Sequence, residues 1–192
     1  MTLTEFFRQR LRPRPRPVLL KPGDTFLFLG RQLQLSCVIT LRKKSFFSVQ
    51  FHEGHLLLHI PQDQWSGPHR HEGYPWMDRL VQFYEKEGRA WIRRRTLHWA
   101  EQMKLFPTKI KFRAPRTRWG SCSSQGSINF NWKLIVFDPT VIDYVVIHEL
   151  AHLQHLNHSR QFWDLVKLHC PDYKIYEKTL KAQQSDPQFL KT

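Results

Sequence analysis

Residues 139–156 constrain the fold of this 192-residue chain more than any other segment. Asp138 is a typical N-cap residue and Pro139 is typical of the first helical position, so the sequence predicts a helix from residue 139 to about residue 156. Apolar residues lie on nearly every side of this helix, namely Tyr144, Val145, Val146, Ile147, Leu150 and Leu153. A helix with this pattern is a buried one, so we expect it inside the core.

The same helix carries an HExxH arrangement of polar residues, His148-Glu149-Leu150-Ala151-His152. Residues four apart lie on one face of a helix, about 6 Å apart along its axis, so His148 and His152 can bind one metal ion. Glu149 lies beside them, where it can take a proton from a metal-activated water. Two surface histidines with an acid between them are the alternative, but a buried helix does not carry such a cluster without a compensating partner. The helix therefore predicts a metal site.

A catalytic zinc ion usually has three protein ligands, so a third ligand is expected. The candidates are His155, His158, Asp172 and Glu177. His155 lies on the same helix face but about 7 to 8 Å along the axis from the midpoint of His148 and His152, which is too far for easy binding of the same metal. His158 becomes available if the chain leaves the helix near Asn157, a residue that tolerates the left-handed conformation of helix ends. Glu177, on a later helix, is the second choice.

The first half of the chain alternates apolar and polar residues before it becomes helical. The period is two between residues 26 and 60, which predicts a small antiparallel β-meander with a turn at residues 52–54. Pro75 and the scarcity of β-branched residues after it predict a long helix to about residue 106. Gly88 is the position where this helix could kink.

A β-hairpin is predicted immediately before the buried helix. Residues 117–121 and 127–132 flank the turn-forming residues 123–126. Ile128, Phe130 and Trp132 should face the core, and Ser127, Asn129 and Asn131 the opposite side, where they either orient a substrate or are solvated.

Helices are expected on both sides of this hairpin and after the buried helix, at residues 159–169 and 172–183. The sequence therefore predicts one unit over residues 21–183, which comprises the meander at 21–62, the long helix at 74–106 and the metal-site region at 107–183.

Positive charge is concentrated in the first 120 residues. The chain has 30 Lys and Arg against 16 Asp and Glu, and residues 121–192 hold 7 of each, so the first 120 residues carry 23 − 9 = +14. Such a field attracts anionic partners such as nucleic acid and nucleotides, although a solvated basic face has the same composition. Alternating Arg and Pro predict a flexible basic arm at residues 1–20, and residues 184–192 are expected to form a tail.

Three widely spaced cysteines, Cys37, Cys122 and Cys170, give no disulfide framework. No apolar run is long enough to span a membrane, and the first residues have no apolar core of a signal peptide. A cytoplasmic protein with no membrane partner is therefore expected.

The motifs from residue 116 to residue 163 resemble the YgjP-like family of metallopeptidases. They read RTRWGSCS at residues 116–123, INFNW at 128–132, YVVIHELAH at 144–152, NHS at 157–159 and FW at 162–163. The family is related to the WLM and SprT-type zinc proteases, so the resemblance implies a zincin-like α+β fold with an active-site helix and hairpin. It also implies that an extended peptide substrate binds as an added strand, and residues 117–122 are the candidate edge strand for it. It also implies a Zn²⁺ ion, or another divalent first-row metal, held by His148, His152 and His158. Family members are also catalogued as nucleotide pyrophosphatases that act on UTP.

Three functions are therefore consistent with the sequence. The first is a zinc metallopeptidase that cleaves a protein or peptide with metal-activated water and Glu149 as general base. The second is a nucleotide hydrolase acting on UTP at the same site, which would require cationic side chains near the metal, such as Arg116, Arg118 and Lys133. The third is a nonspecific nucleic-acid-binding module with a structural metal, which would not require Glu149. The sequence names neither the substrate nor the oligomeric state.

Overall fold

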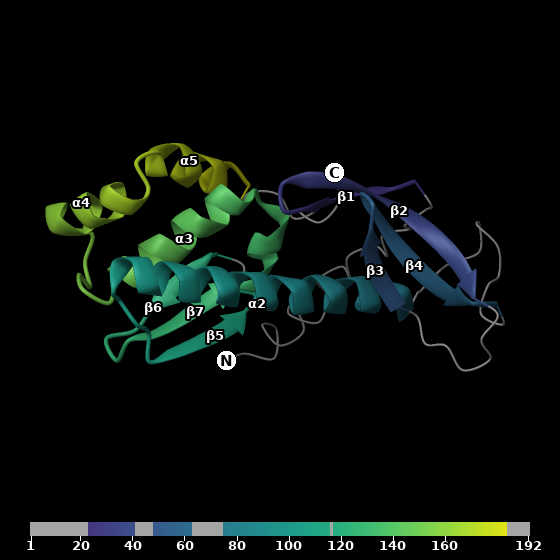
Figure 1. Ribbon diagram of the computed structural model, residues 1–192, viewed down its shortest axis with the longest axis horizontal. Coiled ribbons are helices and arrows are strands. Elements are labelled where there is room, and N and C mark those ends of the chain that lie inside the picture. Colours follow the sequence, from purple (N-terminus) through teal and green to yellow (C-terminus); the bar gives the residue numbers. More distant parts are fainter. Residues whose placement is uncertain (1–22, 41–47, 63–74, 116, 184–192) are drawn as a thin grey trace, which may run out of the picture.

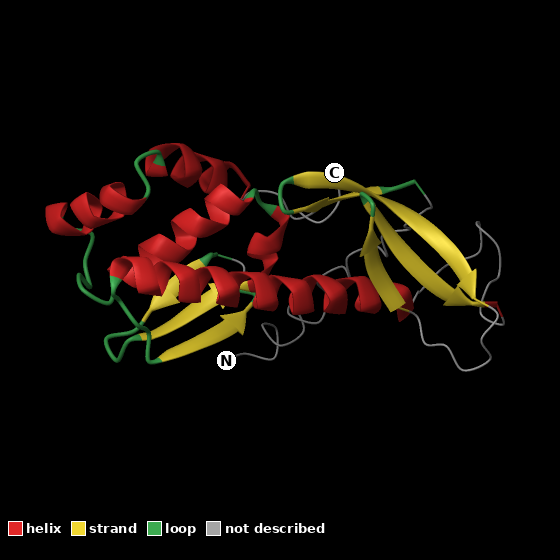
Figure 2. Cartoon of the chain, in the orientation of Figure 1, coloured by secondary structure: helices red, strands yellow, loops and turns green. Residues whose placement is uncertain are grey.

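The computed structural model describes residues 23–40, 48–62, 75–115 and 117–183. These residues form two small β-sheets that are connected by one long helix, with three further helices packed over the second sheet (Figures 1 and 2). The α+β class is confirmed. The predicted arm at residues 1–20 and the tail at 184–192 lie outside the described residues.

The N-terminal sheet has the strand order β1-β2-β4-β3. Its strands are β1 (Thr25–Phe28), β2 (Arg31–Thr40), β3 (Ser48–His52) and β4 (His55–Pro61). The predicted meander is wrong in its topology, because β4 pairs with β2 in parallel and β3 takes the edge. Alternation of apolar residues specifies the buried face of a strand and not the direction of its neighbour. Leu35 and Leu56 are registered partners on the buried face, and parallel pairing satisfies the same pattern.

The turn predicted at residues 52–54 is present between β3 and β4. Glu53 and Gly54 both have positive φ, 45° and 83°, as a two-residue hairpin turn requires. The predicted long helix is α2 (Pro75–Met103), which ends three residues earlier than expected. The helix continues through Gly88 without a break. The glycine allows the backbone of Trp132 to pack closely against α2, because a Cβ atom at residue 88 would overlap the carbonyl group of Trp132.

The second sheet has the order β5-β7-β6, with β5 (Lys109–Arg113), β6 (Gly120–Cys122) and β7 (Ser127–Asn131). The predicted hairpin is confirmed as the antiparallel pair of β6 and β7, while β5 pairs with β7 in parallel. Strand β6 is an edge of this sheet, as predicted. The 3₁₀-helix η2 (Trp132–Val136) follows β7 and packs against α2.

The buried helix is α3 (Pro139–Ala151), followed by α4 (Arg160–His169) and α5 (Tyr173–Gln183). Asp138 is its N-cap as predicted, and its carboxylate accepts a hydrogen bond of 2.9 Å from the Thr140 amide. Helix α3 packs against α2, β6, α4 and α5 (Figure 1). Its apolar side chains are buried. None of the described helices has the length and apolar character needed to cross a membrane.

Candidate metal centre

Three histidines meet at the C-terminal end of α3. His148 lies in the last turn of the helix, His152 is its C-cap, and His158 lies in the connection to α4. One ring nitrogen from each lies within 4.8 Å of the others, and Nε2 of His148 is 3.1 Å from Nε2 of His158. Two imidazoles on one tetrahedral zinc ion would place these nitrogens about 3.3 Å apart, from Zn–N distances of about 2.0 to 2.1 Å. The cluster therefore has the dimensions of a zinc site.

The connection between α3 and α4 brings His158 back to the C-terminal end of α3, because the helix is shorter than the sequence predicted. The helix ends at Ala151 rather than near residue 156, and residues 152–154 form turns. Ser159 then begins α4 as its N-cap, with its hydroxyl accepting a hydrogen bond from the Phe162 amide. His158 directly precedes this cap, so the position of α4 brings its ring toward His148.

The other candidate ligands lie elsewhere. Among the described residues, this cluster is the only group of three or more His, Cys, Asp or Glu side chains suited to a metal. Glu177 is not part of it and accepts a hydrogen bond of 2.8 Å from Lys181 Nζ. His155 contributes its backbone carbonyl, which lies 3.0 Å from His152 Nδ1. This contact fixes the His152 ring and leaves its Nε2 atom for a ligand, as is common for metal-binding histidines.

The surroundings of His148 and His152 favour the neutral imidazole, which is the form that binds a metal. Burial, followed by the neighbouring His152 and His158, lowers the pKa of His148 to about 3. Burial also lowers the pKa of His152, although its contact with the His155 carbonyl opposes this effect. Nδ1 of His148 is buried and has no hydrogen-bond partner among the described residues.

Phe162 supports all three rings from α4. Its ring centroid lies 4.9 Å from that of His148, 4.5 Å from His152 and 4.8 Å from His158. Trp163 stacks on His158 at 5.5 Å and on Tyr173 at 5.0 Å. The sequence did not reveal the role of Phe162, since an apolar residue at helical spacing is indistinguishable from ordinary core.

Glu149 points from α3 toward β6 and is 5% exposed. Burial raises the pKa of its carboxyl group to about 8, and the positive charge of Arg118 acts in the opposite direction. Its Oε2 atom is buried without a hydrogen-bond partner in the described part of the chain. The carboxylate lies against Gly120, where a Cβ atom would come within 2.6 Å of its Cγ and 2.7 Å of its Cδ. Only glycine fits here, a role that the sequence alone did not show.

The polar residues predicted for the outer side of the hairpin have different surroundings. Asn131 is buried, donates hydrogen bonds to the carbonyls of Pro115 and Arg118, and accepts one from the Lys133 amide. It neither orients a substrate nor is solvated, because it holds the connection before β6 in place. Asn129 lies two residues before Asn131 in β7, and its Oδ1 atom is buried without a partner among the described residues.

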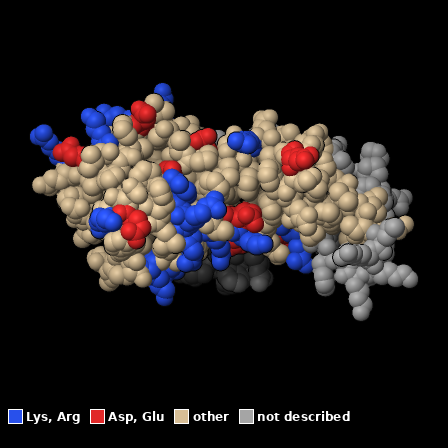
Figure 3. Space-filling view, viewed as in Figure 1, with Lys and Arg blue, Asp and Glu red and all other residues tan. Residues whose placement is uncertain are grey.

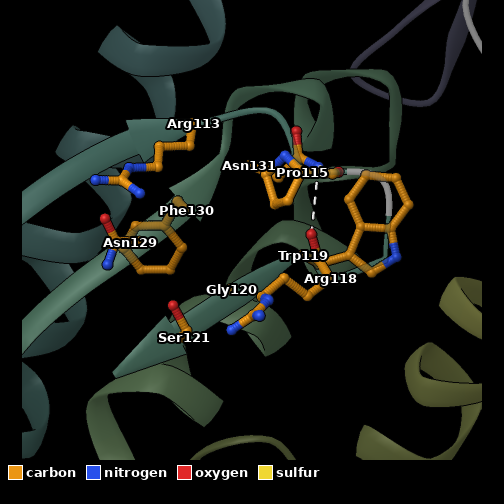
Figure 4. Close-up of a pocket in the computed structure, with 9 residues that line it drawn as sticks. All are labelled: Arg113, Pro115, Arg118, Trp119, Gly120, Ser121, Asn129, Phe130 and Asn131. Carbon is orange, nitrogen blue, oxygen red and sulfur yellow. Dashed lines mark hydrogen bonds between the residues drawn. The ribbon is translucent and has the colours of Figure 1, made fainter. Parts of the chain in front are cut away.

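A cavity of about 310 Å³ lies at β6 and β7, which we call the arginine pocket (Figure 4). Its lining residues include Arg113, Arg118, Trp119, Ser121 and Asn129. Of the three cations expected near a nucleotide, Arg118 lines this pocket and Lys133 lies 5.9 Å from the Trp132 ring, while Arg116 is outside the described residues.

Two solved structures resemble this chain. The metallopeptidase zymogen abylysin of Pyrococcus abyssi is 21% identical, with a TM-score of 0.44 over 48% of this chain and 93% of the other. The metallopeptidase zymogen jannalysin of Methanocaldococcus jannaschii is 19% identical, with a TM-score of 0.41 over 48% of this chain and 94% of the other. A comparison with curated proteins gives no match.

The family comparison covers most of the sequence. The model of the YgjP-like metallopeptidase domain matches residues 3–183. The resemblance noted in the sequence is thereby confirmed, and the chain belongs to the YgjP-like metallopeptidase family.

Proposed function

We propose that the protein is a zinc-dependent metallopeptidase in which His148, His152 and His158 hold the metal and Glu149 is the general base. The observation that carries this proposal is the combination of three converging imidazoles with one buried carboxyl group from the adjacent position of α3. A purely structural zinc site has four protein ligands and has no use for a buried acid beside them. Family membership supports the same reaction class.

The roles of the residues follow from their environment. When bound, a zinc ion supplies an activated water and stabilises negative charge that develops on a carbonyl oxygen. Glu149 is held against Gly120, and its Oε2 atom has no hydrogen bond to any described residue. A carboxyl group whose pKa lies near neutrality can accept a proton and return it to the leaving amine. Another divalent first-row ion would fit the same nitrogen ligands.

The free edge of β6 suits an extended peptide. In β6 and β7, the Asn131 amide donates to the Trp119 carbonyl and the Ser123 amide donates to the Ser127 carbonyl. Because hydrogen-bonded pairs alternate along an antiparallel ladder, Ser121 also faces β7, whereas Gly120 and Cys122 direct their backbone groups toward the open edge. No other described strand pairs there. A substrate strand could bind to these groups beside Glu149.

Hydrolysis of a nucleotide such as UTP is the second candidate, and the arginine pocket is the observation that favours it. A nucleic-acid-binding module with a structural metal is less well supported, because it leaves Glu149 without a role. Figure 3 shows that Lys and Arg gather over α2 and β5, interspersed with acidic residues. We also propose that residues 21–183 form a single domain, with a basic arm before it and a tail after it. The three free cysteines are in keeping with a cytoplasmic location.

The test compares substrates on one preparation. Zinc-loaded protein is incubated with unfolded casein, with and without DNA, and with nucleoside triphosphates. Peptide bond cleavage that is abolished by a chelator and restored by zinc is the expected result. Chelator-sensitive hydrolysis of triphosphate alone would favour the second candidate instead.

A further inference from the structure

Two arginines, Arg113 and Arg118, line the arginine pocket. Among the described residues, neither Arg113 nor Arg118 forms a salt bridge, whereas Arg95 binds the Asp143 carboxylate at 2.6 Å. The residues that line the pocket include no Asp or Glu. Two such cations at one cavity favour an anionic ligand, and the planar guanidinium fork is suited to a carboxylate.

Polar groups between the two arginines have bonding capacity left. In the view of Figure 4, Asn129 and Ser121 lie between the guanidinium groups of Arg113 and Arg118. The amide oxygen of Asn129 is buried without a partner among the described residues, and an amide can present either its oxygen or its NH₂ group to a ligand. The hydroxyl group of Ser121 can donate to an anion. A buried polar atom without a partner calls for one, and a ligand in this cavity would supply it.

The register of the sheet connects this pocket to the substrate edge. Ser121 and Asn129 are registered partners, so their side chains lie on the same face of the sheet. A peptide added to the open edge of β6 would place the residue opposite Ser121 with its side chain on that face. Gly120, which precedes Ser121 in β6, also lines the pocket and lies against the Glu149 carboxyl group. The pocket is therefore next to the reacting centre.

We propose that the arginine pocket binds an acidic side chain, Asp or Glu, of a peptide that lies along β6, and so directs cleavage to bonds near acidic residues. This inference rests on the proposed peptidase function. Arg113 and Arg118 hold the carboxylate from two sides, and Ser121 and Asn129 donate hydrogen bonds to it. The pocket gives the enzyme a substrate class, acidic segments of unfolded protein.

The test begins with the full-length, zinc-loaded protein. Cleavage sites in unfolded casein are mapped by mass spectrometry, and two synthetic peptides are then made that differ only by Glu or Gln at the recurring acidic position. Wild-type protein should prefer the Glu peptide by at least about tenfold in kcat/KM, as expected for a lost charge-assisted contact. The double variant Arg113→Gln/Arg118→Gln should lose this preference. Both arginines are exposed, so the fold should be retained.

Arg79→Gln is the matched control. Arg79 is an exposed arginine on α2 whose Nη1 donates to Gln82, far from the arginine pocket in sequence, so the same substitution there should leave the preference unchanged. A measurement without turnover accompanies the kinetics. Fluorescence anisotropy of the labelled peptides bound to the Glu149→Gln protein should show the same preference for Glu, and its loss in the arginine variant.

The outcomes separate this inference from the proposed function. Chelator-sensitive cleavage with equal rates for the Glu and Gln peptides would overturn the pocket assignment while the peptidase stands. Absence of any cleavage by the wild-type protein would overturn both. If the arginine variant loses hydrolysis of UTP but keeps its peptide preference, the pocket binds phosphate and the acidic side-chain assignment is wrong.

Discussion

Replacement of Gly120 by alanine should impair hydrolysis while the metal remains bound. The added Cβ would lie 2.6 Å from Cγ and 2.7 Å from Cδ of Glu149, whereas ordinary contacts begin at 3.4 Å. The carboxyl group must therefore move by about 0.7 to 0.8 Å, and misplacement of a reacting group by about 1 Å costs on the order of 100-fold in rate. We expect Gly120→Ala to lower kcat by about 10 to 100-fold.

The assay measures casein cleavage and metal content on the same preparation. Metal content should stay at the wild-type value, because Gly120 contacts Glu149 rather than the histidines. Ser124→Ala, an exposed position in the turn of the same hairpin, is the control and should retain wild-type kcat. A folded, metal-loaded Gly120→Ala protein with wild-type turnover would refute the view that the position of Glu149 against β6 matters for the reaction.

Two further predictions concern metal affinity and pH. His158→Ala should weaken zinc binding by roughly 10 to 100-fold in a competition titration, and full retention there with loss in Glu177→Ala would transfer the ligand role to Glu177. Without metal, Glu149→Gln should gain stability relative to wild type as the pH rises from 4.5 to 8, since folded wild-type protein keeps a proton on Glu149 that the unfolded chain releases. The difference in free energy of unfolding should grow by on the order of 3 kcal/mol between pH 4.5 and 7, at 1.36 kcal/mol per pH unit, and a constant difference in urea denaturation would contradict it. The lowered pKa of His148 makes the free energy of unfolding rise with pH below pH 6.5, which is opposite to the effect of Glu149. This contribution is the same in both proteins, so it cancels in the comparison.

Local signals predicted most of the second half of the fold. The cap at Asp138 and the hairpin turn at residues 123–126 are each recognised by side chains that satisfy backbone groups nearby. The end of α3 was harder to predict, because residues 152–156 continue the helical pattern of apolar residues. The turn there depends on where α4 packs, which is a tertiary effect.

Features that depend on contacts between distant segments were not predictable. The parallel pairing of β2 and β4 has the same alternating pattern as a meander. Gly120 looks like any loop glycine until its contact with Glu149, 29 positions later, is known. Asn129 and Asn131 lie on the same face of β7 and look equivalent in the sequence. Asn131 forms hydrogen bonds to the neighbouring loops, whereas Asn129 is available to the arginine pocket.

The central claim is that Glu149 accepts a proton in a zinc-dependent cleavage of peptide bonds. Glu149→Gln preserves the shape of the side chain and removes its ability to accept that proton. The decisive measurement is casein hydrolysis by wild type and Glu149→Gln at equal, confirmed zinc content. We predict a loss of at least about 100-fold in the variant, from the usual size of general acid–base catalysis. Equal turnover by the two zinc-loaded proteins would contradict the role given to Glu149.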